Sequence, residues 1–251
     1  MNCCILPTAR NPYDSESDIE MHHWWFSIRR KLLRSILRAA VPQTGIVCVD
    51  VGCGVGSNIP VLYEAGLHVV GLDRSLDYLK LASRRCKVPL VNADLLTLPF
   101  RSNSIPLMIA MDVLEHIDDD IQGIVELSRC LVPGGILIVT VPAYEFLRGV
   151  QDIVTHHKRR YTRGEIVRKL NAGGFVVTRS SYFNFFLFFP TLVARRLIRL
   201  LELRIETENN VNAPGLNFLL KTIFWLEPII LRQFSLPFGV SVLCVAKKIH
   251  S

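Results

Sequence analysis

Three glycines in five residues mark the part of the sequence best suited to binding a ligand. Gly52, Gly54 and Gly56 lie in the stretch VDVGCGVGSN (49–58), directly after an apolar run that contains Asp50. Side chains at these positions would obstruct a tight turn and the approach of a ligand to the backbone N–H groups. The stretch therefore predicts a strand, a ligand-binding loop and the start of a helix.

Two further aspartates follow the next two apolar runs. Asp73 ends the run HVVGLD, about twenty residues after the glycines, and Asp94 ends the run VPLVNAD. A carboxylate at the end of the second strand of such a sheet can accept hydrogen bonds from both ribose hydroxyls of a nucleoside. An acid at the end of the third can reach the exocyclic amine of adenine. Together these residues predict an adenosine pocket.

The choice between adenosine cofactors depends on Asp50. The spacing G-x-G-x-x-S (52–57) is close to the fingerprint of dinucleotide oxidoreductases, which makes an NAD(P)-dependent enzyme the main rival. Asp50 would place a negative charge near the pyrophosphate of such a cofactor, whereas it would attract a cationic one. An adenosine joined to a cationic amino acid suits all three carboxylates, and S-adenosyl-L-methionine is that molecule.

The elements that must position these residues follow an alternating pattern. Five apolar runs, separated by helical stretches, end in polar or acidic residues, and two more follow: IVCVDVG, HVVGLD, VPLVNAD, IPLMIAMDV, GGILIVTVP, FVVTRSSYF and GVSVLCVAKK. This alternation is typical of a parallel sheet with crossover helices. We expect an α/β, doubly wound, seven-stranded and mostly parallel sheet with its last strand antiparallel.

The pattern divides the chain into three parts. Residues 1–44 are expected to form a tail and a helix from Ser15 to Ala40, and residues 45–182 with 236–251 the cofactor-binding core. Residues 183–235 are expected to form a mostly apolar and basic helical insertion. The apolar stretch FNFFLFFPTLVA (183–194) is too short to span a bilayer, which needs about 20 residues. The arginines that follow alternate with leucines, so the insertion either lies in a membrane interface or packs on the sheet or a second subunit.

The motifs together resemble the class I S-adenosylmethionine-dependent methyltransferases, which have a Rossmann-like fold. The resemblance rests on VDVGCGVGSN (49–58), VVGLDRS (69–75), NADLLTLPF (92–100), AMDVLEHIDD (110–119) and LVPGGILIVTVP (131–142). It implies that Gly52, Gly54 and Gly56 border the methionine portion with Asp50 nearby. It also implies that Asp73 holds the ribose and that Asp94 and Leu95 contact the adenine. Three residues after the fourth strand would line the same pocket, namely Met111, Asp112 and His116.

The flanks resemble one branch of that family, with a Trp-Trp-Phe helix before the core and a G-H-x-R-R-Y-T-like segment after the fifth strand. Here the helix contains MHHWWFSIRR (21–30) and the segment is HHKRRYT (156–162), with His156 in place of the glycine. We expect His157 to act as base or substrate-positioning group, with Tyr161 and Arg160 as polar partners. The alternative is that His157 and Tyr161 only fix the loop.

Two other features are open to more than one interpretation. The aromatic residues of the Trp-Trp-Phe helix either form a lid over the substrate or pack in the core. Glu115 and His116 could form an acid–base pair, but adjacent residues of a helix point to different faces, which favours a capping role and a cofactor contact. The four histidines of the pairs at 22–23 and 156–157 are not expected to bind a metal ion.

Composition narrows the expected partners and location. The formal charge is +7, but exposed aromatics are not interleaved with the basic residues, so a nucleic-acid partner is not expected. The seven scattered cysteines contain no C-x-x-C pair, and no basic segment precedes an apolar stretch at the N-terminus. These features favour a cytoplasmic protein, with the cytoplasmic membrane face as a further candidate location.

The function expected from the sequence is methyl transfer from S-adenosylmethionine to a small-molecule or lipid-linked acceptor, with oxygen as the methylated atom. A non-catalytic, cofactor-binding scaffold on a membrane is the alternative from a different class, ahead of the NAD(P)-dependent oxidoreductase. Acceptor-dependent formation of S-adenosylhomocysteine would distinguish an enzyme from a scaffold.

Overall fold

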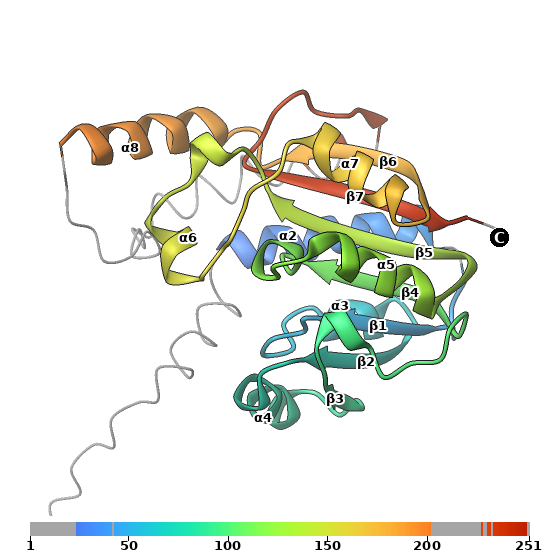
Figure 1. Ribbon diagram of the computed structural model, residues 1–251. Helices are drawn as coiled ribbons and strands as arrows, with labels where there is room; N and C mark the ends of the chain where they lie inside the picture. Colours follow the sequence, from blue (N-terminus) through green and yellow to red (C-terminus); the bar gives the residue numbers. More distant parts are fainter. Residues whose placement is uncertain (1–23, 42, 202–226, 228–229, 232, 250–251) are drawn as a thin grey trace, which may run out of the picture.

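A seven-stranded sheet forms the centre of the protein (Figure 1). The computed structural model describes residues 24–41, 43–201, 227, 230–231 and 233–249. In the sheet the strands follow the order β3-β2-β1-β4-β5-β7-β6. Their bounds are β1 (Val47–Val51), β2 (His68–Asp73), β3 (Leu90–Asn92), β4 (Ile105–Met111), β5 (Leu131–Pro142), β6 (Phe175–Phe183) and β7 (Ser241–Lys248).

The strand directions agree with the expected fold. β1 is parallel to β2 and β4, β2 to β3, and β4 to β5, while β7 is antiparallel to both of its neighbours, β5 and β6. The central strands are buried on both faces, which explains why they consist of nearly continuous apolar runs. The parallel strands place their carboxyl ends at one edge of the sheet, where ligands bind in doubly wound folds.

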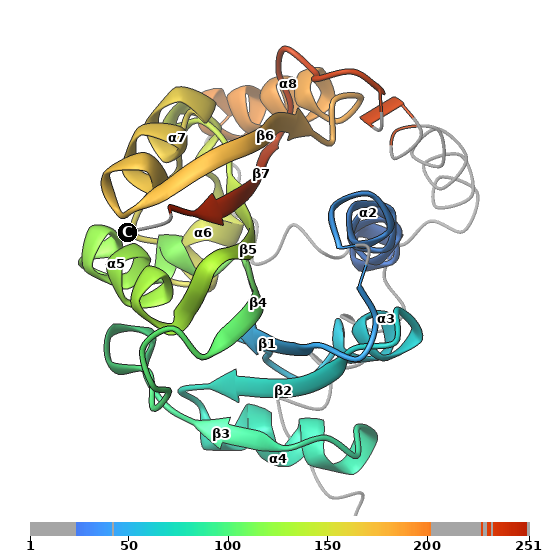
Figure 2. The same cartoon turned by 90° about the vertical axis from the view of Figure 1, so that its right-hand side faces the viewer.

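Helices cover both faces of the sheet. Figure 2 shows α2 and α3 on one face and α5 and α7 on the other. The bounds of the helices are α2 (Trp24–Ala40), α3 (Ile59–Glu64), α4 (Leu76–Arg85), α5 (Asp120–Cys130), α6 (Val150–Val154), α7 (Arg163–Ala172) and α8 (Phe188–Leu200). Three short 3₁₀ helices lie between strands: η1 (Leu95–Thr97), η2 (Leu114–His116) and η3 (Glu145–Leu147).

The sheet separates two hydrophobic cores. On one face Leu33 and Leu37 of α2 pack with Leu62 of α3 against the strands. On the other face Leu127 of α5 and Leu170 of α7 pack against β4, β5 and β7. Fixing helices on both faces holds the strand ends in place, which is what a site at that edge requires.

The described part of the insertion is dominated by α8. Pro190 lies in the first turn of this helix, where the missing N–H would have no intrahelical acceptor. Among the described residues, no helix combines the length and the apolar character needed to cross a membrane. The predicted helix over Ser15–Ala40 is described from Trp24 onward, and its first part, like residues 202–226 of the insertion, lies outside the described residues.

Candidate active site

A cavity of about 670 Å³ opens at the carboxyl edge of the parallel strands. The loops after β1, β2, β3 and β4 line one part of it, and the segment 151–157 lines another. Helices α2 and α8 complete the wall with Arg29, Thr191 and Arg195. The cavity therefore joins segments from the whole chain, from the first described helix to the insertion.

The glycine loop after β1 has a backbone conformation that suits glycine. The φ angles of Gly52, Gly54 and Gly56 are +69°, +53° and +82°. The N–H of Gly52 donates to the carbonyl of Leu72 at 2.7 Å, which ties the loop to β2. A Cβ atom on Gly52 would lie 2.5 Å from Cγ2 of Val113. The sequence requirement for glycine at this position is thus both conformational and steric.

The two aspartates at the adjacent strand ends lie on the rim of the same cavity. Asp73 accepts hydrogen bonds from the N–H groups of Gly54, at 2.9 Å, and Ser75, at 2.8 Å. Asp94 accepts from the N–H of Leu96 at 2.8 Å. Each carboxylate is oriented by backbone donors and still has lone pairs for a ligand, since an ionised carboxylate has about four acceptor positions. Asp73, Asp94 and Leu95 all line the cavity.

The segment after β4 connects the cavity to helix α2. Asp112 has a φ of +57°, unusual for a residue other than glycine, and forms an ion pair with Arg29. The hydroxyl of Thr140 accepts from Arg29 at 3.0 Å and donates to Asp112 at 2.9 Å. Met111, Asp112 and His116 line the cavity, as does Arg29. Arg29 thereby attaches helix α2 to Asp112 after β4 and to Thr140 of β5.

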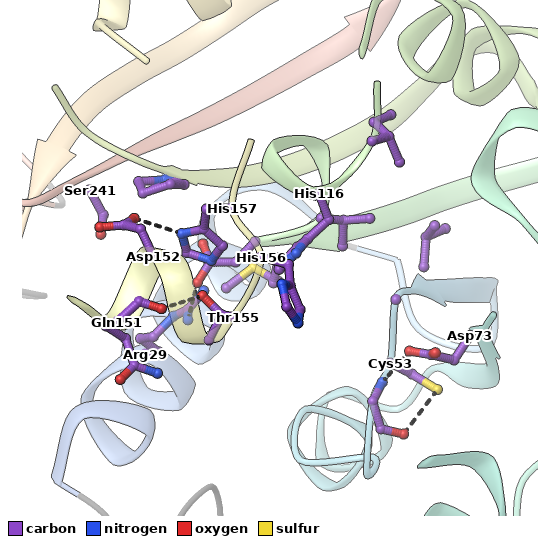
Figure 3. Close-up of a pocket in the computed structure, with 18 of the residues that line it drawn as sticks. Arg29, Cys53, Asp73, His116, Gln151, Asp152, Thr155, His156, His157 and Ser241 are labelled. Carbon is purple, nitrogen blue, oxygen red and sulfur yellow. Dashed lines mark hydrogen bonds and ion pairs between the residues drawn. The ribbon is translucent and has the colours of Figure 1, made fainter. Parts of the chain in front are cut away.

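A carboxylate–imidazole pair lies across the cavity from Asp73 (Figure 3). Nδ1 of His157 is 2.8 Å from Oδ1 of Asp152, a fully buried residue of α6. Arg160 donates to both oxygens of Asp152, at 2.8 and 3.0 Å, and the N–H of Gly149 donates at 2.7 Å. Burial alone would raise the pKa of Asp152, but the bonds from His157 and Arg160 outweigh it and hold that pKa below its usual range. Asp152 is therefore ionised and fixes the orientation of the imidazole.

A third acid lies close to this pair. Nε2 of His157 is 3.9 Å from Oε1 of Glu115, and the rings of His157 and His116 meet edge to face with centroids 4.7 Å apart. Burial, with the charge of Asp112, raises the pKa of Glu115 well above its usual range. Burial, with His157 adding to it, lowers the pKa of His116 to about 4. His116 is therefore neutral near pH 7, and burial favours the protonated form of Glu115.

The arrangement of Glu115 and His116 corrects one premise from the sequence. They are adjacent in the three-residue 3₁₀ helix η2, but their side chains reach the same place, which the expectation of different faces did not allow for. Ligand atoms of both side chains and of His157 lie within 4.8 Å of one another. These residues form one cluster.

Three of the predicted site residues lie away from the cavity surface. The described residues that line the cavity do not include Asp50, Gly56 or Tyr161. Asp50 is fully buried within β1. Tyr161 is also fully buried, and its hydroxyl donates to Asp120 at 2.8 Å, on the α5 and α7 side of the sheet. Burial and the hydrogen bond to Asp120 raise the pKa of Tyr161, which keeps it neutral. This placement favours the interpretation that Tyr161 fixes the loop.

Two residues of the site were missed in the sequence. Asp152 and Arg29 line the cavity, but neither was expected to be a site residue. Asp152 could have been suspected from its position five residues before His157, because a short helix with a turn brings such residues together. Arg29 meets Asp112 only through the tertiary fold, and no local pattern indicates that contact.

The fold and the cavity agree with the class I S-adenosylmethionine-dependent methyltransferases that the sequence motifs resemble. Residues 49–139 match the family described as "Methyltransferase domain". The cofactor suits this rim because a bare backbone at Gly52 lies beside the oriented carboxylates of Asp73 and Asp94.

Individual relatives support the same class. The chain is 39% identical over 98 residues to the demethylmenaquinone methyltransferase of Corynebacterium kroppenstedtii, covering 39% of this chain and 42% of that protein. It is 32% identical over 133 residues to the probable tRNA methyltransferase 9B of Bos taurus, covering 51% and 27%. The chain thus spans less than half the length of both relatives. A geranyl diphosphate methyltransferase solved with S-adenosylmethionine has the same fold, with a TM-score of 0.62 at 16% identity, over 97% of this chain and 93% of that one.

Proposed function

We propose that this protein transfers a methyl group from S-adenosylmethionine to a hydroxyl of a small-molecule or lipid-linked acceptor. The proposal depends on one observation. The same cavity is lined by Gly52, Asp73 and Asp94, which we call the cofactor rim, and by the oriented imidazole of His157. Asp73 lies at one end of that cavity and Asp152 with His157 at the other (Figure 3). A cofactor held at the first end would present its methyl group to an acceptor held at the second.

Positioning supplies most of the expected rate. When bound, the cofactor supplies a methyl group from a sulfonium, so that an O–C bond forms while the S–C bond breaks and the sulfur leaves neutral. Aligning two reactants in this way contributes up to about 7–11 kcal/mol. We therefore expect the walls of the cavity to matter more than any single proton transfer.

His157 is the candidate general base. Its Nδ1 donates to the ionised Asp152, so Nε2 is the nitrogen that can accept the proton of an acceptor hydroxyl. Arg160 acts indirectly, because its guanidinium holds Asp152 rather than the imidazole. This assignment divides the predicted trio into a base, His157, a positioning residue, Arg160, and a structural residue, Tyr161.

The acceptor can be sought by incubating the protein with labelled cofactor and metabolite, lipid or tRNA extracts, followed by mass spectrometry. Acceptor-dependent S-adenosylhomocysteine supports an enzyme, whereas cofactor binding without turnover on any extract supports the scaffold alternative. The tRNA fraction belongs in the screen because of the similarity to tRNA methyltransferase 9B, which favours nucleic acid as a second acceptor class.

With an acceptor in hand, His157→Ala tests the base. General-base catalysis contributes about 10²- to 10⁴-fold in rate, so kcat should fall by that factor while cofactor affinity is retained. His68→Ala, which removes an exposed histidine outside the cavity lining, is the control. Unchanged turnover in His157→Ala would remove this residue from the chemistry.

Helix α8 favours a lipid-linked acceptor, because one of its sides lines the cavity and another exposes apolar residues. Thr191 and Arg195 of this helix line the cavity, whereas Phe189, Val193 and Leu197 are exposed. An exposed apolar stripe beside the cavity suits attachment at the cytoplasmic face of a membrane. Flotation with anionic liposomes should carry the protein upward, and the triple substitution of the exposed stripe by Ser should abolish flotation. Failure of the unsubstituted protein to float would leave a water-soluble acceptor.

A further inference from the structure

We propose that Glu115, His116 and His157 form a three-ligand site for a divalent transition-metal ion, for which Zn²⁺ is the best match. Metal binding can be tested by itself, and only its role in catalysis rests on the proposed function. No metal ion was expected from the sequence, because only the fold brings His157 to Glu115 and His116 of η2.

The ligand atoms lie near the separations that a metal ion needs. One atom from each of the three side chains lies within 4.8 Å of the other two, and Oε1 of Glu115 is 3.9 Å from Nε2 of His157. Tetrahedral Zn²⁺ with ligands at about 2.1 Å brings neighbouring ligand atoms to about 3.4 Å of each other. We expect rotation of the side chains to close that difference when a metal ion binds.

The carboxylate of Glu115 points independently to a cationic ligand. Glu115 is 0% exposed, and among the described residues neither of its oxygens has a hydrogen-bond partner. Burying a polar group without a partner is unfavourable by several kcal/mol, so such groups are normally paired or coordinate a metal. A cation bound between Glu115 and the two imidazoles would satisfy this requirement.

The surroundings of His157 match those of a metal ligand. Metal-bound histidines typically donate their second ring N–H to a carboxylate or carbonyl, which fixes both tautomer and ring orientation. Asp152 accepts from Nδ1 of His157 at 2.8 Å and is itself held by Arg160. The nitrogen directed at Glu115 and His116 is then Nε2, the one that would coordinate.

The ligand set selects the ion and suggests its use. Two imidazoles and one carboxylate suit Zn²⁺ and its transition-metal neighbours, whereas Mg²⁺ and Ca²⁺ favour oxygen ligands. Three protein ligands leave one position open, as in catalytic zinc sites, and His116 and His157 both line the cavity. An acceptor hydroxyl bound there would lose its proton to water more readily, and His157 would then act as a ligand instead of a base.

Cobalt provides the test, because Co²⁺ occupies zinc sites and absorbs visible light when its geometry is tetrahedral. The full-length protein, stripped with a chelator, should bind one equivalent of Co²⁺ with visible ligand-field bands that Zn²⁺ abolishes. Glu115→Gln should weaken binding by more than about 100-fold, and Asp152→Asn, which replaces the carboxylate that orients His157, by about 10- to 100-fold. His68→Ala, which removes an exposed histidine at the start of β2, should bind as the parent does.

Three results would overturn the metal site. They are absence of Co²⁺ and Zn²⁺ binding in a protein that still binds S-adenosylmethionine, undiminished binding in Glu115→Gln, and near-ultraviolet bands of cobalt–thiolate ligation. X-ray absorption of the zinc-loaded protein, which needs no variant, should show imidazole scattering and no sulfur. The proposed methyltransferase activity fails separately, if no acceptor is methylated either with or without added Zn²⁺.

Discussion

Alanine at Gly52 should weaken both the fold and the cofactor site. The φ of Gly52 is +69°, and an alanine there would adopt a left-handed conformation that costs about 1–2 kcal/mol. The new Cβ would also lie 2.5 Å from Cγ2 of Val113, and relieving such overpacking typically costs about 1–3 kcal/mol. Alanine also lowers the conformational entropy of the unfolded chain, which offsets about 0.4–1 kcal/mol of this destabilisation. The net loss of stability should be about 2–4 kcal/mol.

Gly45→Ala separates the backbone effect from the steric one. Gly45 has a similar φ of +75°, but a Cβ there would meet nothing within 4 Å, and the residue lies before β1, away from the cavity. The Gly45→Ala variant should therefore lose only about 1 kcal/mol of folding stability, which comes from the backbone conformation alone. At about 2–4 °C per kcal/mol for a chain of this size, the two melting temperatures should differ by several degrees.

Calorimetry with S-adenosylmethionine and thermal melting of both variants test the reasoning. Gly52→Ala should lose most of its cofactor affinity, because the displaced loop carries the N–H of Gly54 that orients Asp73. Gly45→Ala should bind as the parent does. Equal melting temperatures with unchanged affinity in both variants would refute the assignment of Gly52 to a steric and conformational constraint at the cofactor rim.

Three further outcomes follow from charged groups in the interior. Burial raises the pKa of Glu227 to about 7, above its unfolded value of about 4.3, so its contribution to stability is present below about pH 4 and is lost as pH rises through 7. Urea denaturation should therefore find Glu227→Gln as stable as the parent at pH 4 and more stable at pH 8, by on the order of 3 kcal/mol. Arg160→Met leaves the buried charge of Asp152 short of its main partner and should cost about 3–5 kcal/mol in the same assay. Arg29→Met removes the ion pair with Asp112 and should lower stability by about 2 kcal/mol, with a proportional fall in melting temperature.

The sequence predicted the sheet well because its strands carry a strong local signal. All seven predicted runs overlap an observed strand. The signal is strongest for β4 and β7, because strands buried on both faces need nearly continuous apolar residues. The shortest strand, β3, was expected from VPLVNAD but spans only Leu90–Asn92, because the chain turns at Asp94 to cap η1. Where the signal is weaker, as at this sheet edge, the ends of the element are set by tertiary contacts.

The cofactor rim was predictable for a related reason, which does not extend to the other end of the cavity. Gly52, Asp73 and Asp94 each follow directly after a strand, so the order of the parallel sheet brings them to one edge. Their use by the cofactor stays a prediction. The partners of His157 and Asp112 depend instead on where α6 and α2 pack, and no periodicity in the sequence specifies that.

This difference indicates where the choice of acceptor is encoded. The family match ends at residue 139 and contains the whole cofactor rim. Arg29, Asp152, His157 and Arg195, which line the rest of the cavity, all lie outside the matched segment. We therefore expect cofactor binding to depend mainly on the matched segment, and acceptor binding on the flanking helices. The relatives' different acceptors, a menaquinone precursor and tRNA by their names, are consistent with this division. The acceptor of this protein should therefore be sought through α2, α6 and α8 rather than through the methyltransferase motifs.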